Sequence, residues 1–345
     1  MGTALERSLG IVLPLLVAFT IAAFVLLTIG ENPVEILTLM ATEAFGSARR
    51  FAATLSTSTP LLFTAVATAI CFRSGVFNVG VDGAFVLGGL AAIFIAFTLP
   101  ASLGVGLVPL AFIAAAVTGG LWLWLPGVLL AKYETDEVVS TLMLNFIAAG
   151  ISGYLVNGPL LSPQSGNNVT PLIHEAAELV RLMPPSTLHA GFIIGLFCII
   201  SYWIWCRNTP SGFEGAVVGQ NPRFARAVGI SVPAVIILVM VLSGVIAGFG
   251  GASHGLGQMH RFSDGFSPGY GFTGMAVALL ARNHPIGILF GAVLFGALAS
   301  AGTTIQLFSN IPLDLVNIIQ GTVMIFAVIE ATRLMKIRRR QTHAV

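Results

Sequence analysis

Long apolar stretches run through the whole chain, and they limit its possible folds more than any other feature. A helix needs about 20 apolar residues to cross the hydrocarbon of a bilayer. The 345-residue sequence has ten candidate segments, at residues 9–29, 52–72, 81–99, 105–131, 138–156, 188–206, 233–253, 270–281, 286–302 and 313–332. The eighth segment is short enough to be a half-helix. We therefore predict an all-α integral membrane protein with about ten transmembrane helices, in a single transmembrane domain over residues 1–345.

Composition excludes the main soluble alternatives. Only 9% of the residues are charged, against roughly 25% in an ordinary soluble domain. The net charge of +2 is too small to indicate a nucleic-acid partner. Cys71, Cys198 and Cys206 lie in or beside apolar runs without a CxxC spacing, so they predict neither a disulfide framework nor a metal site.

The basic residues predict the orientation of the chain. With both termini cytoplasmic, 12 of the 16 Lys and Arg residues fall on the inner side, as the positive-inside rule requires. This topology makes 207–232 a cytoplasmic loop, 157–187 a periplasmic loop and 333–345 a cytoplasmic basic tail.

The chain carries no signature of an ATPase. Its only lysines, Lys132 and Lys336, do not follow a glycine, so there is no P-loop. If ATP and Mg²⁺ are used, another chain must bind them, and we predict no cofactor and no catalytic residue here.

Residues 215–230 predict a short capped helix in the cytoplasmic loop. Asn221 is a good N-cap and Pro222 a good first helical residue, and Gly229 suits the left-handed C-terminal position. A helix of about two turns is marginal in water, so it must dock on the membrane domain or on a partner.

Residues 72–85 place glycines beside Asn78 and Asp82. Non-helical backbone at membrane depth is tolerated only where protein or water covers it, and an intramembrane carboxylate suggests a functional site. The alternative is a short cytoplasmic turn in which Asp82 stabilises the next helix through its dipole. Arg73 is the expected ion-pair partner of Asp82 in both interpretations.

Residues 250–275 are rich in glycine and polar groups, next to the short eighth segment. Such a break can mark a transport path, or it can be an ordinary outer loop. The G-x-S-x-G match at Ser253 lacks the preceding strand of a hydrolase elbow, and the histidines outside this region lie in predicted loops or tails or, for His189, at the very start of a predicted span. The pair Gly244 and Gly248 predicts close helix packing.

Four stretches resemble the permease subunits of bacterial ABC importers for nucleosides and simple sugars, within the branched-chain and ribose-type permease superfamily. The nearest branch works with basic-membrane-protein-type binding lipoproteins. Asn78-Val-Gly-Val-Asp-Gly83 resembles its Asn-x-Gly-x-Glu-Gly signature, although Asp82 stands where Glu is usual and Ala84 where Gln is common. The other matching stretches are 136–147, 219–230 and 271–287.

The resemblance implies a vitamin-importer-like permease fold in the bacterial cytoplasmic (inner) membrane. It implies three partners: an ABC ATPase, a second permease that is more often a paralogue than a copy, and an extracytoplasmic substrate-binding protein. It assigns ATPase coupling to Asn221, Pro222, Arg223, Phe224, Ala225, Arg226 and Gly229. The candidate path or gate residues are Asn78, Asp82, Phe85, Asn145 and Phe272, and the candidate broken-helix glycines are Gly75, Gly80, Gly83, Gly269 and Gly271.

We expect the solute to be neutral and polar, a nucleoside before a simple sugar, because no basic residue lies deep in a predicted span. Two other functions stay open from the sequence. One is a proton-coupled secondary transporter that uses Asp82, and the other is an intramembrane serine hydrolase that uses Ser253.

Overall fold

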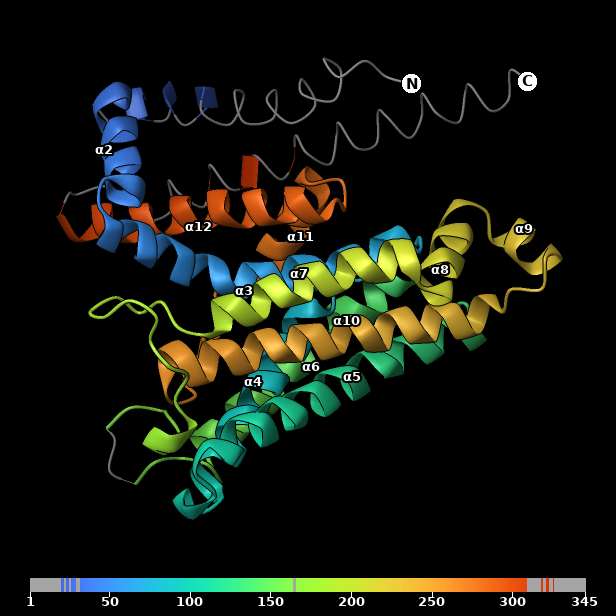
Figure 1. Cartoon of the computed structure of the whole chain (residues 1–345), viewed down its shortest axis with the longest axis horizontal. Coiled ribbons are helices and arrows are strands. Elements are labelled where there is room, and N and C mark those ends of the chain that lie inside the picture. Colours follow the sequence, from blue (N-terminus) through green and yellow to red (C-terminus); the bar gives the residue numbers. More distant parts are fainter. Residues whose placement is uncertain are drawn as a thin grey trace. The chain divides into compact units, whose positions relative to one another are not determined.

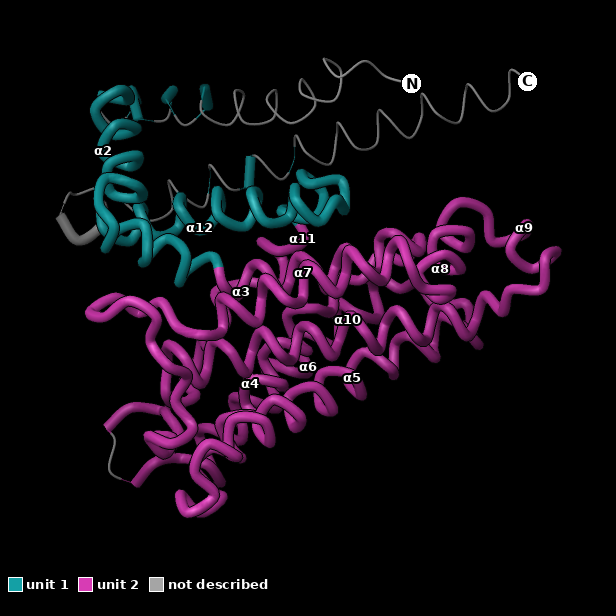
Figure 2. The backbone as a smooth tube through the Cα atoms, viewed as in Figure 1, with its two compact units in different colours: residues 1–58, 276–345 teal, residues 59–275 magenta. Residues whose placement is uncertain are grey.

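The computed structural model describes residues 20–21, 23–24, 26–28, 32–163, 166–308, 318, 321–322 and 325. The chain forms two compact units (Figure 2): residues 1–58 together with 276–345, and residues 59–275. Figure 1 follows the elements along the chain. They are α2 (Pro33–Phe45), α3 (Ala48–Arg73), α4 (Val81–Thr98), α5 (Leu107–Tyr133), α6 (Glu137–Asn157), α7 (Gly191–Asn208), α8 (Pro210–Gln220), α9 (Pro222–Ala227), α10 (Val232–His254), α11 (Tyr270–Leu280) and α12 (Pro285–Phe308), with 3₁₀ turns at Ala101–Gly106 and Glu175–Ala177 and a π-helical turn at Gly255–Met259.

The helices confirm the all-α class and a multi-pass membrane protein. Within the described residues, seven helices are long and apolar enough to cross a membrane, and each coincides with a predicted span. The short eighth segment is the 11-residue helix α11. The first and tenth predicted spans lie almost wholly outside the described residues, so ten spans and two cytoplasmic ends remain predictions.

The structure adds two helices and lengthens a third. α2 and α8 occupy segments that were expected to be loops. Residues 250–254 continue α10, and 255–259 add a π-helical turn, so the predicted glycine-rich break shrinks to 260–269. Helices α3 and α4 pack directly on these glycines: a Cβ on Gly250 would lie 2.8 Å from Phe63 of α3 and 3.1 Å from the ring of Phe85 of α4.

In the larger unit, α10 packs against α4 and α5. A Cβ on Gly244 would overlap the carbonyl oxygen of Gly119, and one on Gly248 would overlap that of Ala115. The predicted close packing at this small-residue pair is confirmed. Small residues let helix backbones approach closely, which favours association where lipid removes the hydrophobic driving force.

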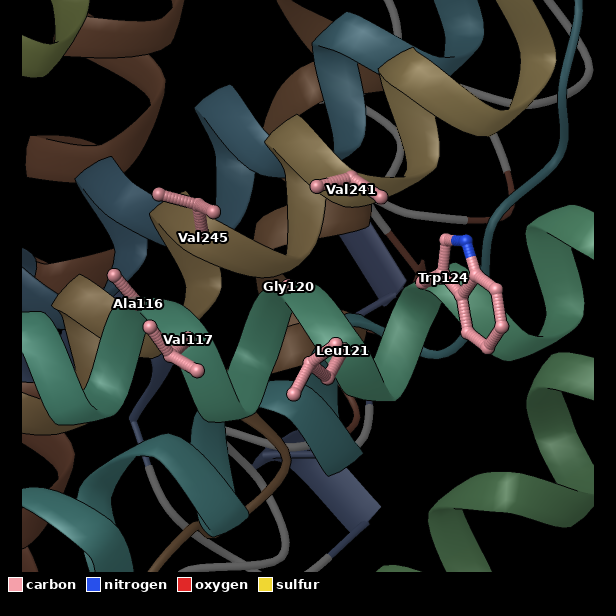
Figure 3. Close-up of a pocket in the computed structure, with 7 residues that line it drawn as sticks. All are labelled: Ala116, Val117, Gly120, Leu121, Trp124, Val241 and Val245. Atoms are coloured by element: carbon pink, nitrogen blue, oxygen red, sulfur yellow. The ribbon is translucent and has the colours of Figure 1, made fainter. Parts of the chain in front are cut away.

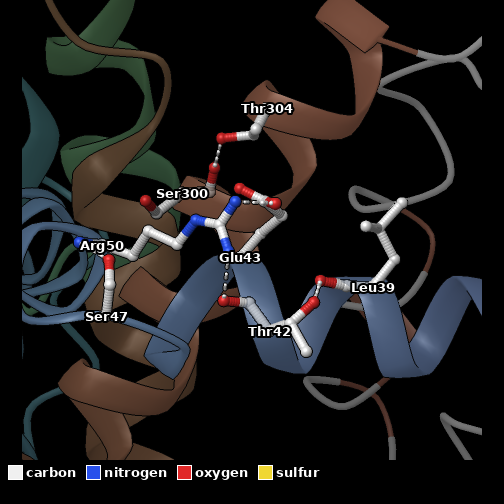
Figure 4. Close-up of polar contacts among 7 residues, drawn as sticks. All are labelled: Leu39, Thr42, Glu43, Ser47, Arg50, Ser300 and Thr304. Carbon is white, nitrogen blue, oxygen red and sulfur yellow. Dashed lines mark hydrogen bonds and ion pairs between the residues drawn. The ribbon is translucent and has the colours of Figure 1, made fainter.

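In the smaller unit, α2 packs on α12 through a cluster of buried apolar side chains that includes Ile36, Met40 and Leu298. The turn between α2 and α3 is tied by Arg50, whose guanidinium lies 2.6 Å from the carboxylate of Glu43 and donates to the carbonyl of Thr42 at 3.3 Å (Figure 4). The smaller unit is thus stabilised by buried apolar contacts between α2 and α12 and by the polar contacts of Arg50 at the turn between α2 and α3.

Candidate functional site

The chain between α3 and α4 is not helical, and its second half packs against α10. The side-chain amide of Asn78 donates to Ser243 Oγ at 3.1 Å, and Ser243 is near the middle of the membrane-spanning helix α10. Just before the break, the thiol of Cys71 lies 3.5 Å from the carbonyl of Val239. Residues 74–80 therefore form a non-helical interruption, and Asn78 within it packs against the middle of α10.

Two residues of α6 satisfy the backbone of this interruption. Asn145 donates to the carbonyl of Val79 at 3.0 Å and accepts from the amide of Gly83 at 2.9 Å. Thr141 Oγ1 accepts from the amide of Val79 at 3.2 Å. Unpaired backbone groups are costly in an apolar medium, so these side chains make the break possible.

Asn78 is fully buried, and its amide group is used within the protein. Its Oδ1 accepts from the amide of Gly80 at 2.8 Å, while its Nδ2 is within 3.1 Å of Ser243 Oγ. Asn78 and Asn145 thus shape the segment from inside, whereas the ring of Phe77 is 40% exposed.

Asp82 joins the N-termini of two helices. It lies in the first turn of α4, and its Oδ1 accepts from the amide of Gly271, in the first turn of α11, at 2.8 Å. The same oxygen accepts from Ser267 Oγ at 2.8 Å. The positive ends of both helix dipoles meet at this carboxylate, which links segments 185 residues or more apart.

The predicted ion pair between Asp82 and Arg73 is wrong. Arg73 Nη2 donates instead to the carbonyl of Cys206, near the end of α7, at 3.2 Å. Among the described residues, the ion pairs are Arg50 with Glu43 and His260 with Glu178.

An aromatic cluster joins α4, the end of α10 and the start of α11. The ring of Phe85 lies 5.5 Å from Tyr270 and 5.9 Å from both His254 and Phe266, between ring centroids. His254 meets Phe266 and Tyr270 edge-on at 5.1 and 5.2 Å. These geometries are the ones that aromatic rings prefer, and Phe85 is fully buried.

The remaining path candidates lie at the start of α11. Phe272 is 38% exposed. Gly269 has φ +92°, a conformation that glycine adopts without strain, and its amide donates to Ser267 Oγ at 3.2 Å. Of the predicted path residues, four lie together where α4 and α11 begin: Asp82, Phe85, Gly269 and Gly271. Four others form or hold the interruption that leads into α4: Asn78, Gly80, Gly83 and Asn145.

The cytoplasmic loop of the topology contains α8 and α9. The Oδ1 of Asn221 accepts from the amides of Arg223 and Phe224 at 3.1 Å, so the predicted N-cap is confirmed. Gly229 has φ +87°. Ala225 is buried while Phe224 and Val228 are 56% and 54% exposed, which leaves an apolar face open to the surroundings.

Sequence reasoning missed Ser267, Thr141 and Ser243 as polar partners of the broken segments. Ser267 followed by Pro-Gly before a short apolar helix was the available signal, because serine caps helices. Its Oγ accepts from the amide of Tyr270 at 3.1 Å. Thr141 and Ser243 carry no such local signal.

An apolar groove of about 400 Å³ opens between α5 and α10 (Figure 3). It is lined by Ala116, Val117, Gly120, Leu121, Trp124, Val241 and Val245. Apart from the indole of Trp124 these side chains carry no hydrogen-bonding group, so the groove does not suit a polar solute.

Ser253 has a histidine nearby, contrary to expectation. A Cβ on Gly191 would overlap Ser253 Oγ and lie 2.7 Å from Nδ1 of His189, so the two side chains flank the same glycine. His189 Nδ1 accepts from the amide of Gly191 at 3.2 Å. Ser253 Oγ has no hydrogen-bond partner in the described part of the chain, so the nucleophile–base bond of a hydrolase is not formed.

Comparison with known proteins identifies the family of this chain. Residues 50–328 match the branched-chain amino acid transport system / permease component family. The chain is 34% identical to the guanosine ABC transporter permease protein NupP of Bacillus subtilis, over 82% of each chain. It is 34% identical to the nucleoside ABC transporter permease protein NupB of Lactococcus lactis subsp. cremoris, over 90% of this chain and 88% of that one. It is 31% identical to the glucose ABC transporter permease protein TsgB13 of Haloferax volcanii, over 92% and 86%.

Proposed function

Because this chain belongs to the branched-chain amino acid transport system / permease component family, we propose that it forms the translocation path of an ABC importer for nucleosides, with simple sugars as the next solute class. The relatives named for guanosine, for nucleosides and for glucose support this order. The membrane is the bacterial cytoplasmic membrane. Partners are an ATPase, a second and paralogous permease, and an external substrate-binding protein.

The meeting of α4 and α11 at Asp82 is the observation that carries the proposal. Two helices begin there inside the bundle, and one of them is too short to cross a bilayer. Discontinuous helices whose N-termini face each other at membrane depth are typical of transport paths. The surrounding groups are aromatic rings, a serine and glycine amides, which suits a neutral solute with a planar base and hydroxyl groups.

The exposed face of α9 supports a separate ATPase. Phe224 and Val228 place apolar surface beside the exposed Arg223 and Arg226. Apolar surface rimmed by charge marks a protein-binding site. We propose that α9 inserts into the ATPase and that ATP binding and hydrolysis there drive the permease by a rigid-body shift.

Reconstitution tests the function as a whole. The permease is purified through a tag together with the ATPase, second permease and binding protein encoded with it, and proteoliposomes are assayed for uptake of radiolabelled guanosine and glucose. We expect uptake that requires ATP and survives collapse of the proton gradient. Uptake driven by a pH gradient without ATP would instead identify a secondary transporter.

A single substitution tests the docking face. Phe224→Asp puts a carboxylate on the proposed apolar contact, and we expect at least a tenfold loss of ATPase co-purification. The matched control is Leu172→Asp, which changes a side chain that is 64% exposed in the loop before α7. Equal ATPase recovery with wild type, Phe224→Asp and Leu172→Asp would disprove docking through α9.

A further inference from the structure

A backbone-to-backbone contact joins α8 to the turn that ends α3. A Cβ on Gly75 would lie 3.0 Å from Gly219 Cα, and a Cβ on Gly219 would lie 2.9 Å from the amide nitrogen of Gly75. On Gly219 it would also overlap the carbonyl oxygen of Arg73. Neither position has room for a side chain, so the two main chains touch directly.

Two more contacts hold the same turn, at residues 73–75. A Cβ on Gly215, one helical turn before Gly219, would lie 2.6 Å from Ser74 Oγ. Arg73 Nη2 donates to the carbonyl of Cys206, at the end of α7, at 3.2 Å. The turn at 73–75 is therefore held by α8 and by the helix that precedes α8.

The turn leads straight into the interruption that ends at Asp82. Residues 76–80 follow it without a helix, and Asp82, in the first turn of α4, then holds the N-terminus of α11. On the other side, α8 ends at Gln220 and α9 begins at Pro222. A continuous series of contacts thus runs from the exposed face of α9 to the candidate gate.

We propose that Gly75, Gly215 and Gly219 are the positioning residues that carry a displacement of α9 to the interruption at 74–80 and so to Asp82. The inference rests on the proposed function, since it needs an ATPase that moves α9. In this mechanism α8, α9 and the turn 73–75 move as one body, and the interruption behind them changes between two arrangements.

Close packing is the physical reason. Long side chains between two elements can absorb a small shift by changing rotamer, whereas main chains in contact cannot. Protein interiors have low compressibility and transmit strain, so a direct contact passes a shift on undiminished. A coupling route also requires an element with two discrete arrangements. We assign that role to the short segment that separate hydrogen bonds hold to α6 and α10.

The first test separates docking from transmission. Gly219→Ala wedges α8 away from the turn, and we expect normal ATPase co-purification, at least a tenfold loss of uptake, and loss of the stimulation of ATPase activity by the solute-loaded binding protein. The matched control is Gly150→Ala, in α6, where a Cβ meets no atom within 4 Å; its uptake should stay within twofold of wild type. Wild-type uptake by Gly219→Ala would overturn the proposal.

A cross-link tests whether the two elements move as one body. The Cβ position of Gly215 lies 3.8 Å from Ser74 Cβ, the mean separation in disulfides. In the double variant Ser74→Cys/Gly215→Cys, the two reduced side chains crowd the contact and should lower uptake, whereas oxidation should form the bond, close the contact and raise uptake again. Uptake that falls on oxidation and returns on reduction would show that the surfaces slide, and would overturn the proposal. The two single-cysteine variants control for oxidation elsewhere.

The readouts distinguish this proposal from the one it rests on. If wild-type protein recovers no ATPase and shows no ATP-dependent uptake, the proposed function fails. If the wild type couples normally while Gly219→Ala also transports normally, or the cross-link blocks uptake, only the transmission route fails. Should Gly219→Ala not accumulate in the membrane, the cross-linked pair decides.

Discussion

Polar side chains are scarce in this chain, and at the scale of single residues several of them pair with backbone. Asn145 pairs with the carbonyl of Val79 and the amide of Gly83, and Asp82 pairs with the amide of Gly271. Lipid offers no hydrogen-bond partner, so any departure from a helix needs such side chains. The non-helical segment 74–80 is therefore stable only while polar side chains such as that of Asn145 pair with its backbone.

Asp82 provides a graded test. Asp82→Asn keeps an oxygen where Oδ1 now accepts both bonds, so we expect a loss of uptake of only a few-fold. Asp82→Ala removes both bonds, at about 1.5–3 kcal/mol for each charged hydrogen bond, and should abolish uptake and lower the melting temperature. A proton-coupled transporter would show no such grading, because Asp82→Asn already removes the titratable group and would stop uptake as completely as Asp82→Ala.

Asn145 tests the cost of the interruption. Asn145→Leu leaves one buried carbonyl and one buried amide unpaired, at about 1–3 kcal/mol each. We expect a clear fall in the melting temperature of the detergent-purified protein. Asn145→Asp, which retains the acceptor for Gly83 but not the donor for Val79, should lie between Asn145→Leu and wild type. Identical melting curves for all three proteins would disprove the role.

At the scale of elements, α9 illustrates how local chemistry specifies a short helix. Asn221 caps its first amides. At its end the amide of Ile230 donates to the carbonyl of Ala225 at 2.9 Å, with Gly229 in the left-handed conformation. Such a closure satisfies carbonyls that have no partner in the helix. The six-residue element thus depends on its caps rather than on its length.

Loss of the N-cap should loosen this element alone. Replacing a capping Asn by Ala costs about 1 kcal/mol, so Asn221→Ala should speed amide hydrogen exchange at 223–226 by about fivefold. Asn221→Asp retains the capping oxygen and should exchange as wild type does. Unchanged exchange in Asn221→Ala would show that tertiary contacts, not the cap, hold α9.

At the scale of the whole molecule, the loop between α6 and α7 is folded onto the segment that follows α10. The amides of Thr170, Ile173 and Leu179 donate to the carbonyls of Phe262, His260 and Leu256 at 2.9–3.0 Å. His189, at the end of the same loop, is buried with 1% of its surface exposed. Burial, and to a smaller extent the nearby His260, together lower its pKa to about 4.

This layer should be sensitive to acid. The pKa of an unfolded histidine is about 6.5, so between about pH 6.5 and pH 4 the unfolded chain binds more protons than the folded one. Stability should therefore fall as the pH falls through that window. His189→Asn keeps an acceptor for the amide of Gly191 and cannot titrate. We expect its melting temperature to fall less than that of wild type between pH 7.5 and pH 4.5; parallel losses would disprove the assignment.

The sequence alone determined the features that depend on neighbouring residues. Seven helices coincide with predicted spans because the length of an apolar run is itself the signal for crossing a bilayer. The position of α9 was predicted correctly from Asn221, Pro222 and Gly229, because a capping residue acts on a helix end only a few residues away. The resemblance placed the chain in its family through short motifs of the same local kind.

Only the tertiary structure decided which distant groups meet. Asp82 was expected to pair with Arg73, nine positions away, but it binds Ser267 and Gly271, while Arg73 reaches the end of α7. Residues 254–259 lie beyond the predicted span 233–253 in a glycine-rich stretch, yet they remain helical, with Ile93 of α4 packed against Gly255. In both cases the deciding energy comes from long-range packing and from hydrogen bonds that lipid cannot replace, and neither is encoded in local sequence.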